Sequence, residues 1–260
     1  MSNENFQKPN DMEAQRSGRS IRLDVRGLRA VAVLAVLLYH ANSGWLKAGF
    51  VGVDVFFVAS GFIITALLTE RIEKIDLAVF YLSRFTRILP TYFAMFVVVC
   101  ALSKVLFLPA DFSFFQESLK SAALFTSSYY CAGFGNYCTP SADALPLLHT
   151  WSLAVEMQFY LLFPIWYVLT PRVCRLPIFL LWAIALFYWS SYQIFESKCD
   201  SLYFSLLARA PDFIIGAIVA LLLRDYELPR KISVFTGVLG AAFLVRSFIF
   251  KEKQRFPGLW

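Results

Sequence analysis

The sequence predicts an all-α membrane protein, a polytopic bundle of transmembrane helices. Two observations carry this prediction. Hydrophobic residues make up 58% of the 260 residues and charged residues only 16%, whereas soluble domains are about 45–50% apolar and about 25% charged. The apolar residues also gather in segments of about 20, the length that a helix needs to cross a bilayer. A chain of this kind must place apolar surface against lipid, which excludes an ordinary soluble protein.

Seven segments are long and apolar enough, or nearly so, to be spans. They are residues 28–45, 49–69, 88–109, 151–170, 176–195, 203–223 and 233–250. The stretch Ala122–Tyr130 is apolar but short, which is typical of a re-entrant or interfacial segment. Residues 1–20 are polar and basic, without the apolar core of a signal peptide. We expect a disordered cytoplasmic tail over 1–20 and one membrane domain over 21–260.

Basic residues indicate the orientation of the bundle. They precede the first segment and follow the second, fourth and sixth, which predicts a cytoplasmic N-terminus. Lys251, Lys253 and Arg255 after the seventh segment conflict with this pattern. The net charge of +6 is spread over these loops and does not form the basic face of a nucleic-acid-binding protein, so no nucleic-acid partner is expected.

Cysteine and histidine are sparse in this chain. Five Cys and two His show no spacing typical of a metal site, so no metal is expected. Cys131 and Cys138 lie in the segment 110–150, which this orientation places outside. In an oxidising compartment they could form a disulfide, and two unpaired thiols are an equal alternative.

Arg29 and His40 lie in the same predicted span. Eleven residues separate them, about three helical turns, so both point the same way and lie roughly 16 Å apart along one face. Ionisable residues inside a span are costly and normally face a cavity or a partner. Histidine is the usual proton carrier near neutral pH, although a packing His and an Arg reaching to the interface are the structural alternative.

Asp54 and Glu156 are predicted to lie near the depth of His40, in the second and fourth spans. A carboxylate beside an imidazole would fix its tautomer and raise its basicity. We therefore predict His40, Glu156 and Asp54 as catalytic residues. The alternative is that either carboxylate binds backbone or water at the interface.

Two further polar pairs lie at helical spacing. Arg84 and Arg87 open the third span on the cytoplasmic side, and paired Arg groups suit a phosphate or diphosphate. With Arg29 they predict a donor-binding cluster, against the alternative of ordinary anchoring by basic residues. Arg209 and Asp212 have the i, i+3 spacing of a structural ion pair in the sixth span.

The motifs taken together resemble the membrane acyltransferase-3 family, which includes bacterial O-antigen and polysaccharide O-acetylases. The resemblance covers nearly the whole chain after residue 20, in the order of the family. It rests on LDVRGLRAVAV (23–33), YH (39–40), GFVGVDVFFVASGF (49–62), RFTRILP (84–90), LLHTWSLAVEMQFY (147–160) and RAPDFIIG (209–216).

This resemblance implies an integral-membrane O-acyltransferase of the bacterial inner membrane. Its cosubstrate would be an acyl-CoA, commonly acetyl-CoA, and no bound cofactor is implied. The acceptor would be a hydroxyl of a lipopolysaccharide, an exopolysaccharide or a lipid-linked saccharide. The essential His of the family corresponds to His40, its paired Arg to Arg29, and its Arg-x-x-Arg motif to Arg84 and Arg87. Trp151 and Ser152, which lie within the matching motifs, are expected to be structural.

The chain departs from the family pattern at its C-terminus. Family members typically have about ten spans, and we expect about seven or eight here, because the chain stops at Phe256–Trp260. A truncated and inactive family member is therefore one alternative. A multi-span transporter is another, since intramembrane charges also mark transport paths, although no internal repeat favours it.

Overall fold

The structure, a computed structural model, describes residues 9–42, 45–46, 48–70, 76–106, 109–133, 147–195, 202–224 and 229–249. Within these ranges it is built from helices and contains no strand, which confirms the all-α prediction. The elements are α1 (Pro9–Ala41), α2 (Val51–Glu70), α3 (Leu77–Leu106), α4 (Pro109–Ala123), α5 (Ser127–Ala132), α6 (Thr150–Leu169), the 3₁₀ turn η2 (Arg172–Cys174), α7 (Arg175–Phe195), α9 (Leu206–Leu222) and α10 (Arg230–Ile249).

Each of the seven predicted spans coincides with a helix. Among the described helices, α2, α3, α6 and the stretch Arg172–Gln193 are long and apolar enough to cross a membrane. Helix α9 has 17 residues, and α10 is continuously apolar only over Val234–Arg246. The membrane character is therefore confirmed, and a total of seven or eight spans stays a prediction. The short segment predicted at Ala122–Tyr130 falls across the end of α4 and the start of α5.

Two predictions concern the terminal and outer segments. Helix α1 begins at Pro9, and the division of the chain into a tail over 1–20 and a membrane domain over 21–260 stays a prediction. A helix that is already formed extends at little cost, and Pro suits a first helical turn. The thiol of Cys131 is free and buried, as in the unpaired alternative. Cys138, residues 1–8 and residues 250–260 lie outside the described residues.

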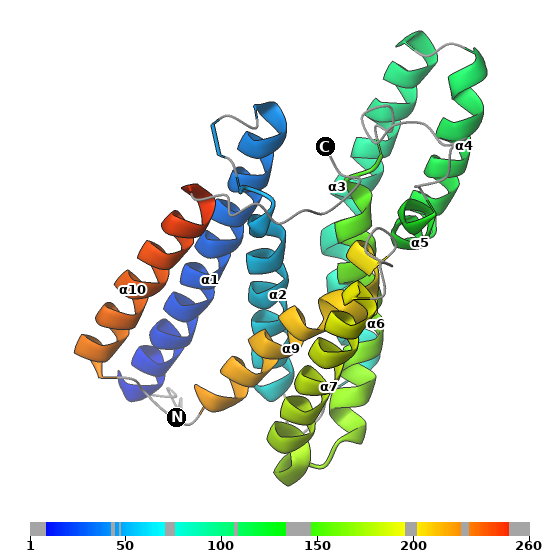
Figure 1. The fold of residues 1–260 in the computed structure, drawn as a ribbon. Coiled ribbons are helices and arrows are strands. Elements are labelled where there is room, and N and C mark those ends of the chain that lie inside the picture. The colour runs from blue at the N-terminus through cyan, green and yellow to red at the C-terminus, as the bar shows by residue number, and fades with distance from the viewer. Residues whose placement is uncertain are drawn as a thin grey trace, which may run out of the picture.

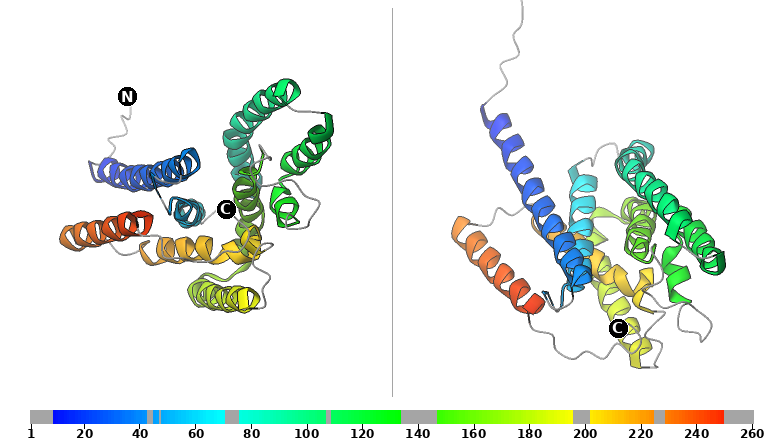
Figure 2. Two further views of the ribbon diagram at one scale, coloured as in Figure 1. Left: turned by 45° about the horizontal axis from the view of Figure 1, so that its top comes forward. Right: turned by 90° about the horizontal axis from the view of Figure 1, so that it is seen from above.

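Helix α2 lies at the centre of the bundle. Helix α1 packs along one side of it, and α9 crosses it and packs on α7. Helices α3, α4, α5 and α6 form the other half, with α4 and α5 beside α3 and α6 (Figures 1 and 2). Helix α10 is tied to the loop between α1 and α2 by a backbone hydrogen bond from Ala48 N to Phe248 O of 3.2 Å.

The crossing of α2 and α9 depends on two glycines. A Cβ added to Gly61 would collide with the backbone of Phe213, and one added to Gly216 would collide with the carbonyl oxygen of Val58. Small residues of this kind let two membrane helices approach backbone to backbone. Gly49 and Gly52 allow a similar close approach to α1, because a Cβ added at either would collide with the backbone of that helix.

Aromatic side chains fill the core where α2, α6 and α9 meet. Phe213 stacks on Phe57 and on Phe159, with ring centroids 4.6 and 4.2 Å apart, and Phe159 stacks on Phe163 at 4.6 Å. All four rings are buried. Offset stacks of this kind stabilise more than their buried area alone. The core therefore fixes α2, α6 and α9 relative to one another, and these three helices carry most of the polar residues described below.

Candidate functional site

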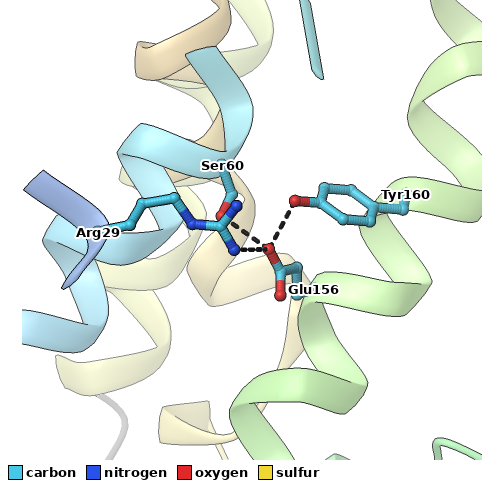
Figure 3. A network of polar contacts seen from close by, with 4 residues as sticks. All are labelled: Arg29, Ser60, Glu156 and Tyr160. Atoms are coloured by element: carbon cyan, nitrogen blue, oxygen red, sulfur yellow. Dashed lines mark hydrogen bonds and ion pairs between the residues drawn. The ribbon is translucent and has the colours of Figure 1, made fainter. Parts of the chain in front are cut away.

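A buried carboxylate joins α1, α2 and α6. Glu156 has a side chain only 2% exposed, and its Oε1 accepts three hydrogen bonds (Figure 3). Arg29 Nη2 donates at 2.9 Å, Ser60 Oγ at 2.8 Å and Tyr160 OH at 2.6 Å. The guanidinium of Arg29 also lies 4.3 Å from the ring centroid of Phe56. A carboxylate with one cation and two hydroxyl donors is satisfied as an anion even in an apolar interior.

This geometry corrects the predicted place of Glu156. We expected its carboxylate beside His40, and it binds Arg29, which lies three helical turns away from His40. Counted from the start of α6, Glu156 is six residues inside the helix, about 9 Å. That depth is beyond the reach of a residue in the last turn of α1. An orienting role of Glu156 on His40 by direct contact is therefore not supported by the geometry.

The partner of His40 is a second imidazole. His40 lies in the last turn of α1, and its ring centroid is 4.4 Å from that of His149, at an interplanar angle of 79°. His40 Nδ1 is 2.8 Å from the carbonyl oxygen of Val36. A carbonyl can only accept, so Nδ1 carries the proton, and Nε2 of the neutral ring keeps its lone pair. Both residues reach the surface at this end of the bundle.

Asp54 binds Arg209 and not His40. Its Oδ1 accepts a hydrogen bond of 2.6 Å from Arg209 Nη1, which ties α2 to α9. Arg209 Nε donates to the carbonyl oxygen of Tyr203 at 3.1 Å, and the guanidinium lies 4.3 Å from the ring centroid of Tyr203. Arg209 thus pairs with Asp54 in place of the predicted Asp212. A helical side chain leans toward the N-terminus of its helix, which carries Arg209 toward Tyr203 and away from Asp212.

The predicted three-arginine cluster is not formed by direct contact. Arg29 donates to Glu156 and stacks on Phe56. Arg84 lies on α3 with its guanidinium 5.5 Å from the ring centroid of Phe80, and Arg87 is exposed one turn further along. Helix α3 packs on α4 and α6, whereas α1 packs on α2. Donor binding by the three arginines therefore stays a prediction.

Trp151 and Ser152 lie in the first turn of α6, and their structural role stays a prediction. Trp151 is buried and contacts the rings of Phe57, Tyr203 and Phe204, with centroids 6.3, 5.2 and 5.2 Å away. Ser152 Oγ donates to the carbonyl oxygen of His149 at 3.2 Å, which closes the first turn of α6. These contacts hold the start of α6, and with it His149, against α2.

Sequence reasoning missed three residues of this site. His149, Ser60 and Tyr160 all lie inside the motifs that carry the family resemblance, but none was predicted to have a role. Tyr160 follows Glu156 by four residues, and i, i+4 neighbours share a helix face, so this contact could have been predicted. The His149 contact depends on how α1 and α6 are placed and has no such signal.

Comparison with known proteins addresses the family. The profile of the acyltransferase domain of the acyltransferase-3 family matches residues 22–252. The chain belongs to this family. It is similar to the O-acetyltransferase OatA of Staphylococcus aureus, strain NCTC 8325, with 32% identity over 251 residues and 88% of this chain. It is also similar to the peptidoglycan O-acetyltransferase OatA of Listeria monocytogenes, with 30% identity over 244 residues and 87% of this chain.

The lengths of the matched proteins differ from that of this chain. The alignment covers 40% of the staphylococcal protein and 38% of the listerial one, so the chain spans about two fifths of these relatives. No solved structure matches the chain. The comparisons therefore establish the family of the membrane domain, and the donor, acceptor and activity of this chain are proposals.

Proposed function

We propose that the protein transfers an acyl group, acetyl in the first instance, from acyl-CoA to a hydroxyl of a cell-surface glycan or lipid-linked saccharide. The family match and the two O-acetyltransferase relatives support this reaction class. The observation that carries it is the imidazole of His40, whose Nδ1–H is held by Val36 O. That hydrogen bond selects the tautomer whose lone pair lies on Nε2, and this is the atom that would act as the base toward an acceptor hydroxyl.

The reaction needs one proton to move twice. His40 Nε2 takes the proton of the acceptor hydroxyl while the oxygen forms a bond with the acyl carbon. The bond between the acyl carbon and the CoA sulfur breaks, and the imidazolium returns the proton to that sulfur. The products are an ester and free CoA. An acyl-imidazole formed on His40 is the two-step version of the same chemistry.

The donor is proposed to enter from the cytoplasm. Arg84 and Arg87 would bind the phosphates of CoA there, because paired guanidiniums suit phosphate oxygens. Arg29 uses its Nη2 to bind Glu156, and a guanidinium has five N–H groups, so it can serve the donor as well as the ion pair. The pair with Glu156 would position the face of α1 that leads from Arg29 toward His40.

The location follows from the basic loops. We propose the bacterial inner membrane with a cytoplasmic N-terminus, since the positive loops mark the inner side. The name of the listerial relative points to peptidoglycan as acceptor of that protein. For this chain the acceptor class is therefore a glycan at the outer face, which includes peptidoglycan, lipopolysaccharide and exopolysaccharide.

The test is acyl transfer by the His40→Ala variant. The wild-type chain and the variant are produced in cells that lack their own O-acetyltransferase, and surface glycans are compared by mass spectrometry for an acetyl increment. We expect the increment with wild type and its loss with His40→Ala. The matched control is Tyr129→Gln, a change of an exposed ring on α5, which should leave the increment in place.

Two results would contradict the proposal. Full acetylation by an inserted His40→Ala variant would remove His40 from the chemistry. No increment with well-inserted wild type would favour the inactive alternative, and saccharide uptake by vesicles without acyl-CoA would favour the transporter. Membrane insertion of every variant is checked by extraction and size-exclusion chromatography, so that loss of folding is not read as loss of chemistry.

A further inference from the structure

The imidazole rings of the two histidines of the chain are in contact. The sequence contains only His40 and His149, more than a hundred residues apart, and the fold places their ring centroids 4.4 Å from each other. His40 comes from the end of α1, and His149 is the N-cap residue of α6. His149 makes no side-chain capping hydrogen bond, so its imidazole is not used to begin the helix.

The helix ends favour different protonation states for the two rings. Helix α1 ends one residue after His40, and the unpaired carbonyls at a helix C-terminus attract a positive charge. His149 lies at the N-terminus of α6, whose unpaired N–H groups repel one. Partial burial among the surrounding helices lowers the pKa of the His149 imidazole, and the neighbouring charge of His40 lowers it further. His149 is therefore expected to stay neutral beside His40.

We propose that His149 is a positioning residue that packs against His40 and stays neutral, so that the two rings together hold only the one proton that His40 Nε2 takes from the acceptor hydroxyl. This inference rests on the proposed function. In the step described above, the proton leaves the hydroxyl as the ester bond forms and ends on the CoA sulfur as the thioester bond breaks. Between these events the imidazolium of His40 packs edge to face against the neutral ring of His149, with ring centroids 4.4 Å apart. His149 thus takes the place that sequence reasoning gave to a carboxylate.

Other titratable groups of the described residues lie near this end of the bundle. Asp54 of α2 and Arg209 of α9 bind each other at 2.6 Å, and Asp212 of α9 interacts electrostatically with both. Besides burial, the charge of His40 lowers the pKa of His149. Among the described residues, titratable side chains at this end also include Tyr39 of α1, whose ring centroid is 5.3 Å from that of His40, Tyr203 before α9, and Tyr130 and Cys131 of α5.

Nuclear magnetic resonance tests, without any assay of activity, whether His40 affects the protonation of His149. Because the chain has two histidines, ¹⁵N-histidine labelling of the whole protein in nanodiscs gives two imidazoles, assigned with His40→Gln and His149→Gln. In His40→Gln the midpoint of His149 should rise by about one pH unit, the size expected for coupled sites. An unchanged midpoint of His149 would overturn the inference.

Kinetics tests the positioning role. In His149→Phe we expect the acyl-transfer rate at neutral pH to fall about 10- to 100-fold, the effect seen when a residue that orients a metal-bound His is lost. KM for the donor should stay unchanged, and the acid limb of the pH profile should move to lower pH, because an apolar ring stabilises a neighbouring imidazolium less than a neutral imidazole does. His149→Gln keeps an acceptor oxygen and should restore part of the rate and of the profile.

The outcomes separate this inference from the proposed function. If wild type transfers acetyl groups and His149→Phe lowers the rate equally at all pH values, His149 is only structural and the inference fails alone. If His149→Phe matches wild type in rate and profile, the inference also fails. If wild type transfers nothing, the proposed function fails. The midpoint of His149 in wild type and in His40→Gln still decides whether the protonation of the two imidazoles is coupled. Tyr129→Gln again serves as control.

Discussion

The Arg29–Glu156 ion pair allows a quantitative test of what holds α1 in the bundle. The side chain of Glu156 is 2% exposed and that of Arg29 19% exposed. Breaking a buried pair by removing one partner costs about 3–5 kcal/mol, because a charge is left without compensation. Without Glu156, the guanidinium of Arg29 would still be partly exposed and would still stack on Phe56. Glu156→Leu should therefore cost about 3 kcal/mol, at the lower end of that range.

Removing a hydroxyl donor should have a smaller effect than removing the carboxylate. Tyr160→Phe deletes the 2.6 Å hydrogen bond to Glu156 Oε1 and leaves the ion pair in place. Hydrogen bonds to charged groups contribute about 1.5–3 kcal/mol, so the cost should fall in that range. The measurement is the free energy of unfolding in detergent micelles, obtained by titration with a denaturing detergent.

A double-mutant cycle decides whether the contact itself is responsible. Arg29→Met and Glu156→Leu are measured singly and together. Because the two side chains are in contact, the double variant should be more stable than the sum of the single losses predicts, by about 2 kcal/mol, within the range seen for coupled neighbours. A cost below about 1 kcal/mol for Glu156→Leu, or additive losses in the cycle, would refute the reasoning that this pair anchors α1 to α2 and α6.

Two further predictions concern packing and exposure. Gly216→Leu should prevent the backbone contact of α9 with Val58 of α2 and abolish a monodisperse folded protein in size-exclusion chromatography, and a folded variant of normal stability would contradict the observed crossing. Burial raises the pKa of the Cys131 thiol to about 12, so little reactive thiolate exists near neutral pH, whereas Cys174 is exposed. Maleimide should therefore label Cys174 and spare Cys131 in the folded protein, and with the proposed orientation Cys174 should react only after the inner membrane is opened. Rapid labelling of Cys131, or labelling of Cys174 from outside intact cells, would count against the fold or the orientation respectively.

Most of the apolar helices and four polar residues of the candidate site can be recognised from the order of the amino acids alone. Apolar segments of about 20 residues must form helices in lipid, since each unpaired backbone group there would be costly. The same cost makes Arg29, His40, Asp54 and Glu156 conspicuous among their apolar neighbours in the chain. Their helical spacing also places Arg29 and His40 on one face, because that depends only on the geometry of a single helix.

Which of these residues meet depends on the packing of the helices. Depth along a span can be counted from the sequence, but the partner of a side chain depends on where helices cross and how they are rotated. The glycines at positions 61 and 216 fix the crossing of α2 and α9, and this crossing brings Asp54 within ion-pair distance of Arg209. The packing of α1 and α6 around α2 allows the ion pair between Glu156 and Arg29, and it places His149 beside His40. The two histidines therefore lie together because of how the helices pack, and no local sequence pattern predicts this contact.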